Sequence, residues 1–308
     1  MKLLSFMEFT DCVKEHIGDR MEDSGRQCEI YVRKITKNNG VVLTALQILE
    51  DGDNCTPSIY LEPYYQKYQD EVPLEQLVME MMQFYHFHKD EMNVPVDDLS
   101  SFASMKDKII MRLVNYERNQ EILQDCPHIR WHDLAVTFRW LAHSDEVGIA
   151  TALISNREMD MWETSVEELH ELAAWNMPRI FPCSIQSMRE VLLEHMECEG
   201  MDDNQMIEPD AQPGIKMYVI TNEQRINGAT SILYPGMLEH FAKQQNANLY
   251  LLPSSIHEMI LIPEEPGMQV SELKNMVINA NMTVVEDGEI LSNHVYLYCR
   301  EKNAVAMY

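Results

Sequence analysis

The sequence predicts an α+β fold, in which an N-terminal helix–β-hairpin–helix unit precedes mixed ββαβ-type sheet units with helices on their faces. Three observations lead to this class. Apolar residues make up 45% of the 308 residues, which is enough for a packed core. Segments with the apolar spacing of helices are interspersed with short apolar or alternating segments that are typical of strands. The dipeptides Asn39-Gly40 and Asn227-Gly228 separate pairs of strand candidates, as hairpin turns do.

The first predicted unit spans residues 1–125. Apolar side chains recur at helical spacing in three of its segments. The last of these ends at Cys126-Pro127, because the residue before a proline disfavours helical geometry. A hairpin is expected between the first two segments. The expected helices cover residues 5–20, 74–90 and 99–124, and the expected strands cover residues 28–37 and 41–50.

The second predicted unit spans residues 126–308. An acidic loop or linker at 197–214 interrupts it, since this segment contains two prolines, two glycines and little apolar surface. Thr164 and Glu167 form a capping-box pattern before one of the helices. The order ββαβ occurs on both sides of the linker. Strands are expected over 134–142, 149–155, 216–221, 229–234, 249–253, 257–263 and 294–299, and helices over 165–176, 187–196, 271–281 and from residue 235.

The charge of the chain limits its partners. Fifty acidic residues against 24 basic residues give a net charge of −26 when histidine is neutral. Such a surface repels phosphate backbones and anionic membranes, so the sequence predicts no direct nucleic-acid binding and no membrane binding. A basic protein surface is the partner that this charge favours.

The cysteines and the apolar segments predict a cytoplasmic protein. Seven cysteines are scattered and never form C-x-x-C, which favours reduced, buried thiols over disulfides or zinc ribbons. The first residues do not form the long apolar stretch of a signal peptide, since Glu8 and Asp11 interrupt it. No apolar run approaches the ~18 residues of a membrane span.

The best-spaced metal candidates are His128 and His132, with Asp133 adjacent to them. Histidines at i and i+4 share one face of a helix, which is the geometry that a metal needs. However, no third ligand is evident, and the segment lies between Pro127 and a strand, so turn histidines that cap or pack explain the pattern better. The sequence therefore predicts no metal site and no cofactor. If a site exists, it is expected near these three residues.

The segment LYLLPSSIHEMILIP raises the question of catalysis, because Ser255, His257 and Glu258 follow one another closely. On a strand, Ser255 and His257 would lie roughly 7 Å apart, which is too far for a nucleophile and its base. Pro253 and the two serines after it are instead good turn residues. We therefore expect a hairpin turn here and no catalytic residues.

Several segments together resemble an uncharacterised bacterial family known only as a domain of unknown function. The matching segments run across nearly the whole chain: KNNGVVLTAL, PSIYLE, PHIRWHDLAVTF, MYVITNEQRINGA, ILYPG, LYLLPSSIHEMILIP and LSNHVY. The resemblance implies a bacterial α/β protein, and it brings no activity, cofactor or catalytic residue.

The sequence leaves three classes of function open. The first is a non-catalytic, acidic cytoplasmic interaction or regulatory protein, which is favoured because neither G-x-S-x-G, a P-loop nor G-x-G-x-x-G is present. The second is an enzyme whose site is assembled by the fold. The third is an acidic mimic of nucleic acid that inhibits a DNA-binding protein.

Overall fold

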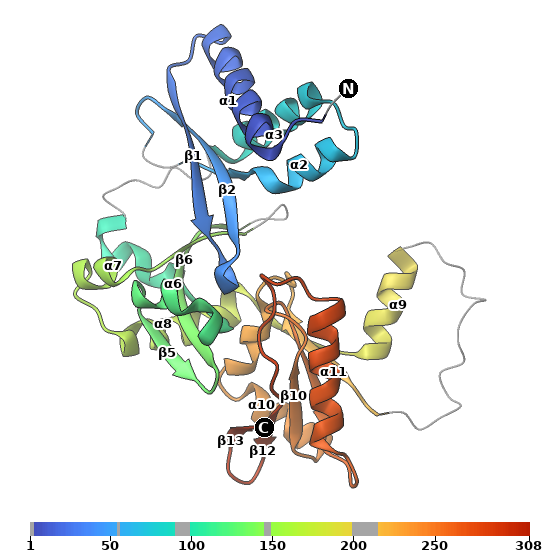
Figure 1. Ribbon diagram of the computed structural model, residues 1–308. Helices are drawn as coiled ribbons and strands as arrows, with labels where there is room; N and C mark the ends of the chain where they lie inside the picture. The colour runs from blue at the N-terminus through green and yellow to red at the C-terminus, as the bar shows by residue number, and fades with distance from the viewer. Residues whose placement is uncertain (1–2, 54–55, 90–98, 145–148, 199–214) are drawn as a thin grey trace. The chain divides into compact units, whose positions relative to one another are not determined.

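The computed structural model describes residues 3–53, 56–89, 99–144, 149–198 and 215–308. It confirms the α+β class, since helices alternate with antiparallel sheets along the chain (Figure 1). The chain forms two compact units. Unit 1 comprises residues 1–108 and 140–152, and unit 2 comprises residues 109–139 and 153–308. The division that the sequence suggested, into residues 1–125 and 126–308, stays a prediction.

In the described part of unit 1, a three-stranded antiparallel sheet is covered by helices over residues 6–23, 61–69 and 74–89. Helix α1 buries the apolar stripe that the sequence predicted, and a complete capping box of Ser5 and Glu8 begins it. The β1–β2 hairpin pairs Thr36 with Val42 next to Asn39, whose φ of 58° is the left-handed geometry expected of an Asn-Gly turn. The elements are α1 (Phe6–Asp23), β1 (Cys28–Thr36), η1 (Asn38–Gly40), β2 (Val42–Glu50), β3 (Ser58–Tyr60), α2 (Leu61–Gln69) and α3 (Leu74–Lys89).

The core of unit 1 is formed by the helix stripes and one face of the hairpin. Phe9 and Ile17 of α1, Leu46 of β2 and Met81 and Tyr85 of α3 are fully buried in one cluster. The hydroxyl of Tyr85 donates to Glu50 at 2.9 Å, and Lys89 pairs with the same carboxylate. The two helices predicted over 5–20 and 74–90 are therefore confirmed.

The helix predicted over residues 99–124 is wrong. Residues 109–115 instead form strand β4, flanked by short helical turns. The segment Ile109–Asn115 is rich in Ile, Leu and Val, which favour strands, and both of its faces are covered, so it lacks the period-two pattern of a half-exposed strand. The elements here are α5 (Phe102–Met105), η3 (Lys106–Lys108), β4 (Ile109–Asn115), η4 (Glu117–Asn119) and α6 (Gln120–Gln124).

Strand β4 belongs to a four-stranded sheet of order β4-β6-β5, in which β7 also pairs with β6. Helix α8 packs against β4 and begins at Ser165, whose hydroxyl accepts from the Glu168 amide. The cap thus lies one residue beyond the predicted Thr164. The elements are β5 (His128–Trp131), β6 (Leu134–Ser144), β7 (Ile149–Leu153), α7 (Asn156–Met161) and α8 (Val166–Ile180).

Unit 2 also contains a six-stranded antiparallel sheet of order β13-β12-β10-β11-β9-β8. Helix α11 packs on the face that carries Tyr250, Leu252 and Ile262 (Figure 1). Its elements are β8 (Cys183–Ser187), α9 (Met188–Cys198), β9 (Tyr218–Asn222), η6 (Gly228–Leu233), α10 (Met237–Gln245), β10 (Leu249–Pro253), β11 (Met259–Pro263), α11 (Val270–Thr283), β12 (Tyr296–Cys299) and β13 (Ala304–Met307). The predicted acidic linker lies outside the described residues from 199 onward.

The strand predicted over residues 229–234 is also wrong, because this segment forms the 3-10 helix η6. Asn227 adopts a left-handed φ of 54° and Gly228 follows it into the interior. The hydroxyl of Thr230, fully buried, accepts a hydrogen bond from the Leu113 amide of β4 at 3.1 Å. Tertiary contacts of this kind override the local strand preference of a short apolar segment.

Candidate functional site

The PSSIHE segment forms the turn of the β10–β11 hairpin, as predicted. Pro253 pairs with Met259, and the amides of Ser254 and Ser255 both donate to the Glu258 carbonyl. The Ser255 hydroxyl accepts from the His257 amide at 3.0 Å, and the Ser254 hydroxyl donates to the Glu258 carboxylate at 2.9 Å. Both serines therefore make local turn hydrogen bonds, and neither hydroxyl is bound to the imidazole.

Both nitrogens of His257 are occupied. Nδ1 accepts from the Asn227 amide at 3.2 Å, which requires that Nδ1 be unprotonated. Nε2 then bears the proton and faces Oε1 of Glu289 at 3.2 Å. A histidine held from both sides lacks the unoccupied nitrogen that a general base needs. His257 thus joins the hairpin turn to two other loops of unit 2.

Gly228 shows how closely the chain approaches this turn. A β-carbon at residue 228 would lie 2.1 Å from Oγ1 of Thr221, 2.6 Å from the Asn222 amide nitrogen and 2.7 Å from the His257 carbonyl oxygen. Two of these three atoms belong to the backbone, so only glycine fits. The Thr221 hydroxyl also donates to the His257 carbonyl at 2.8 Å. Asn227-Gly228 is therefore a site of close packing as well as a turn.

A second polar cluster lies at the β5–β6 hairpin, and we call it the Asp133 cluster (Asp133, Ser292, His294 and Tyr296). The hairpin pairs Trp131 with Leu134, so His132 and Asp133 form its two-residue turn. His132 adopts a φ of 56°, a geometry that histidine tolerates better than most non-glycine residues. This turn places the Asp133 carboxylate beside the segment that leads into β12.

The Asp133 carboxylate faces three donors. Oδ2 accepts from the Ser292 hydroxyl at 2.7 Å and lies 3.1 Å from Nδ1 of His294, while Oδ1 accepts from the Tyr296 hydroxyl at 2.5 Å. Ser292 and Tyr296 are fully buried. Burial and the adjacent carboxylate raise the pKa of Tyr296 well above its ordinary value, because both disfavour a phenolate. Tyr296 therefore remains a hydrogen-bond donor across the physiological pH range.

His294 is the most exposed member of the Asp133 cluster, with 37% of its side chain exposed against 16% for Asp133. Its Nδ1 faces Asp133, and its Nε2 makes no hydrogen bond with a described residue. A carboxylate at Nδ1 favours the tautomer in which Nε2 can accept a proton. Ser292 cannot act as its nucleophile, because the serine hydroxyl is buried and donates to Asp133. The cluster thus offers one base and no nucleophile.

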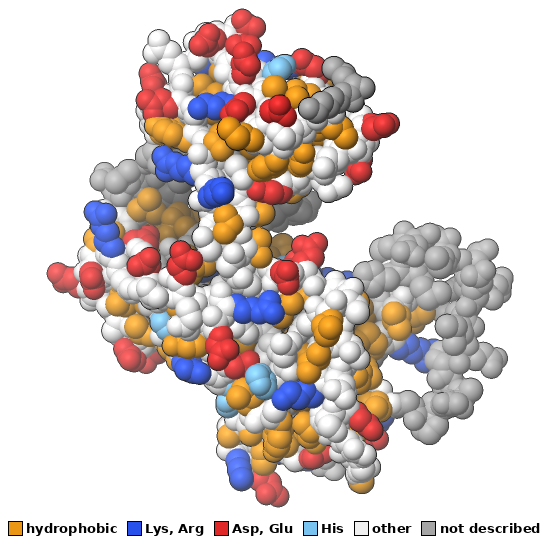
Figure 2. All heavy atoms as spheres, in the orientation of Figure 1, with side chains coloured by type: hydrophobic (Ala, Val, Ile, Leu, Met, Phe, Trp, Pro, Cys, Tyr) orange, Lys and Arg blue, Asp and Glu red, His pale blue; other side chains and the backbone are white. Residues whose placement is uncertain are grey.

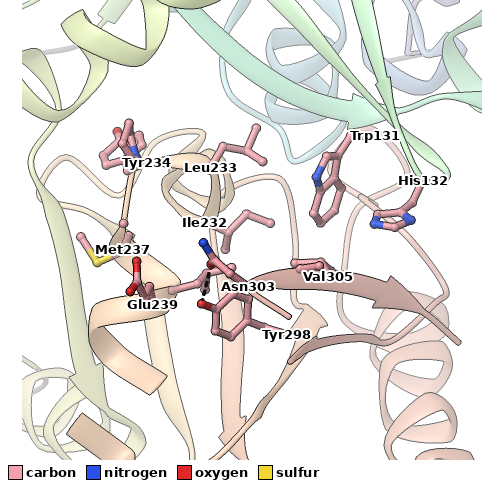
Figure 3. A pocket seen from close by; sticks show the side chains of 14 residues that line it. Trp131, His132, Ile232, Leu233, Tyr234, Met237, Glu239, Tyr298, Asn303 and Val305 are labelled. Atoms are coloured by element: carbon pink, nitrogen blue, oxygen red, sulfur yellow. Dashed lines mark hydrogen bonds between the residues drawn. The ribbon is translucent and has the colours of Figure 1, made fainter. Parts of the chain in front are cut away.

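A pocket of about 340 Å³ opens next to the Asp133 cluster, and we call it the Trp131 pocket. The ring centroids of Trp131 and Tyr296 are 5.2 Å apart, so Tyr296 of the cluster packs against Trp131, which lines the pocket. Figure 3 shows Trp131 and His132 on one side and Met237 and Glu239 on the other, with Val305 and Tyr298 between them. The remaining lining residues are Ile232, Leu233, Tyr234, Pro235, Gly236, Leu238, Asn303 and Ala304.

The three sequence candidates lie in different places. His128 is on strand β5, where its Nδ1 faces the Cys126 carbonyl at 3.0 Å. His132 lines the Trp131 pocket, and Asp133 belongs to the Asp133 cluster. A strand followed by a turn replaces the helical spacing that would have put the two histidines on one face. Among the described residues, no group of three or more His, Cys, Asp or Glu side chains is arranged to hold a metal ion.

Sequence reasoning missed Ser292, His294 and Tyr296, because they lie about 160 residues from Asp133 in the chain. Their own signal is the run of polar side chains at Ser292, Asn293 and His294, but an ordinary loop before a strand has the same composition. Two of the described cysteines, Cys126 and Cys183, are no alternative nucleophiles. Burial raises the pKa of Cys126 and of Cys183 to about 11, so both thiols stay protonated near neutral pH.

Within the described part of the chain, no helix combines the length and apolar character needed to cross a bilayer. Comparison of the sequence with known protein families gives a match over nearly the whole chain. Residues 6–300 match the model of DUF5688, a family of unknown function. Neither the curated proteins nor the solved structures contain a match to this chain. Since the match covers nearly the entire sequence, the chain belongs to the DUF5688 family of unknown function.

Proposed function

We propose that this protein is a non-catalytic, acidic interaction or regulatory protein of the cytoplasm that binds a basic surface of another protein. The observation behind the proposal is that both units are acidic. Unit 1 has 22 acidic and 11 basic residues, a net charge of −11, and unit 2 has 28 acidic and 13 basic residues, a net charge of −15. The acidity therefore does not arise from the segment around residues 197–214 alone.

The acidic side chains lie on the visible face of each unit and are interspersed with fewer basic ones (Figure 2). Many of the basic residues are already paired. Lys89 contacts Glu50 and Asp53, and Lys67 contacts Glu80. Like charges spread over a surface add to one long-range field, which accelerates the approach of a cationic partner. This supports a basic partner and disfavours polyanions.

The polar clusters of unit 2 support a non-catalytic role. The nitrogens of His257 are both occupied, and the hydroxyls of Ser254 and Ser292 donate to carboxylates. An acyl-transfer site needs a nucleophile within about 2.6–3.2 Å of its base, and neither cluster provides that pair. Their hydrogen bonds instead hold together loops that are distant in sequence.

An enzyme is the second candidate, and one observation favours it. The Asp133–His294 pair leaves Nε2 of His294 partly exposed, and this arrangement could serve as a general base. A hydrolase and lyase substrate panel, run with wild type and with His294→Gln, tests this candidate. Turnover that falls by 10²-fold or more in the variant, the usual contribution of a general base, would establish an enzyme.

The experiment for the proposed function uses the full chain as bait for cellular partners at 0.1 M salt. Each captured protein is then purified, and its affinity is measured by calorimetry from 0.1 to 1 M NaCl. Over this range the Debye length falls from about 10 Å to about 3 Å, so the affinity for a basic partner should fall steeply. A partner that binds equally well at both salt concentrations contradicts the proposal.

The same complex separates an interaction protein from a mimic of nucleic acid. If the partner is a DNA-binding protein and the chain occupies its DNA site, duplex DNA should displace the chain in competition. If the partner has no DNA site, or if DNA and chain bind together, the mimic is excluded and the basic interface is retained.

A further inference from the structure

We infer that the Trp131 pocket is the site that receives an arginine side chain from the basic partner. This inference rests on the proposed function and deepens it, because it names the point of contact and the chemical group recognised. The pocket lies within unit 2 and is assembled from the β5–β6 hairpin, η6 with the start of α10, and the β12–β13 hairpin (Figure 3).

The first argument is aromatic. Trp131 packs against His132 at a centroid distance of 4.7 Å and against Tyr296 at 5.2 Å, so the indole is held in place. Tyr296 is in turn fixed by its hydrogen bond to Asp133. Indole faces attract cations most strongly among the aromatic side chains, and a guanidinium can also stack on them through its planar group. A fixed indole on a pocket wall is therefore suited to arginine.

The second argument is charge. Glu239 is the one carboxylate among the pocket-lining residues that the structure describes, and this lining includes no lysine or arginine. Hence no cation of the lining itself occupies the pocket. The nearest competitor is Lys243, one helical turn along α10, which pairs with Glu239. Both partners of that pair are well exposed, so the pair is weak and an incoming guanidinium can replace it.

The third argument concerns the remaining polar groups. The indole N–H of Trp131 makes no hydrogen bond with a described residue, so it can donate to a carbonyl of the partner chain. The Tyr298 hydroxyl donates to Oδ1 of Asn303 at 2.8 Å, which fixes the amide at the pocket floor (Figure 3). Apolar side chains such as Ile232 and Val305 are available for the methylene groups of an arginine stem.

The test uses the full chain with Nα-acetyl-arginine amide as the probe and two comparison probes. The neutral isostere Nα-acetyl-citrulline amide removes the charge and keeps the shape, and Nα-acetyl-lysine amide keeps the charge and removes the planar group. Binding is followed by the indole N–H signals of the four tryptophans in ¹⁵N NMR, and Trp131→Phe assigns the signal of Trp131.

We expect the arginine probe to shift the Trp131 signal saturably, with citrulline about tenfold weaker and lysine about two- to fivefold weaker. Glu239→Gln should weaken arginine binding several-fold, whereas Glu265→Gln, an equal charge change on an exposed loop outside the pocket lining, should not. Lys243→Gln should strengthen it, because the competing cation is gone. Val305→Trp should fill the pocket and abolish binding.

Equal binding of citrulline and arginine would overturn the inference in favour of a neutral, apolar ligand. A shift of all four indoles, or an equal effect of Glu239→Gln and Glu265→Gln, would reduce the binding to general charge attraction and would overturn it too. The proposed function, binding of a basic partner, can be refuted independently of the arginine pocket. If the pocket fails, a salt-sensitive partner complex persists and is unaffected by Val305→Trp; if the partner fails, the arginine probe still binds.

Discussion

Asp133→Ala should be among the most destabilising single substitutions at the surface of unit 2, although Asp133 is not a core residue. The change removes the acceptor of the Ser292 and Tyr296 hydroxyls, both of which are fully buried and cannot turn to water. A buried donor left without a partner costs about 1–3 kcal/mol. Two such donors give an expected loss of about 2–6 kcal/mol in the free energy of unfolding, while His294 is exposed enough to be hydrated.

The partners of Asp133 should show a graded response. Tyr296→Phe removes a donor to Oδ1 of Asp133. The Asp133 side chain is 16% exposed, so water can replace the lost donor, and a cost of about 0.5–1.5 kcal/mol is expected. His294→Gln should cost less than about 0.5 kcal/mol, as most exposed substitutions do. Asp287→Ala is the matched control, because its side chain is 89% exposed in a nearby loop, and it should be close to neutral.

The assay is urea unfolding followed by far-UV circular dichroism, with a double-mutant cycle of Asp133→Ala and Tyr296→Phe. Since the two substitutions disrupt the same hydrogen bond, their combined cost should be smaller than the sum of the single costs. If Asp133→Ala does not fold, Asp133→Asn replaces it, because the amide retains one acceptor oxygen. An Asp133→Ala protein within 0.5 kcal/mol of wild type, or additive costs in the cycle, would refute the argument for a buried network.

Four further predictions concern other parts of the chain. Gly228→Ala should cost about 3 kcal/mol or more in urea unfolding, since its β-carbon would lie 2.1–2.7 Å from three atoms. Gly267→Ala, at a φ of 93° with no atom nearby, should cost only about 1 kcal/mol, and equal costs for the two substitutions would contradict the close approach at residue 228. Burial and Asp133 raise the folded-state pKa of Tyr296 above its ordinary value of about 10, so the stability that the neutral phenol contributes is present below pH 10 and is lost at higher pH, by about 1.4 kcal/mol per pH unit. The free energy of unfolding, measured from pH 8 to 11, should therefore decline less steeply in Tyr296→Phe than in wild type. Ile262→Ala should cost about 2–5 kcal/mol in urea unfolding, because this side chain is fully buried under α11, whereas Ser255→Ala removes one turn hydrogen bond and should cost at most about 1 kcal/mol. Stoichiometric labelling of Ser254 or Ser255 by a phosphonate would refute the turn assignment. The purified protein should hold no stoichiometric zinc or iron, and elemental analysis that finds about one metal per chain would contradict this expectation.

The elements that sequence patterns predicted correctly are those with local causes. The β1–β2 hairpin follows from Asn39-Gly40, and α1 follows from its apolar stripe. The errors have tertiary causes. Strand β4 has apolar side chains on both faces, which gives no period, and η6 replaces a strand because Gly228 must approach Thr221 and His257 closely. A local pattern contains no information about such an approach.

The candidate site was only partly predictable for the same reason. Asp133 could be chosen as an acid beside two histidines, and the structure places it in a polar cluster, but with His294 instead of His128. That pairing depends on which loop the sheet order brings to the β5–β6 turn. The Trp131 pocket likewise depends on three segments that are more than 50 residues apart, so its composition could be known only after the fold was known.

The segments that carry the family resemblance meet in pairs in unit 2. PHIRWHDLAVTF and LSNHVY come together at the Asp133 cluster, and MYVITNEQRINGA and LYLLPSSIHEMILIP come together at Gly228 and His257. In each pair a polar side chain from one segment satisfies a buried or partly buried group of the other. A serine, a histidine or an acid in these segments thus has a structural reason to be present, because removing it leaves a partner without its hydrogen bond. The same residues therefore give no support to catalysis by themselves, and the test of chemistry belongs at the groups that these clusters leave exposed: Nε2 of His294 and the indole of Trp131.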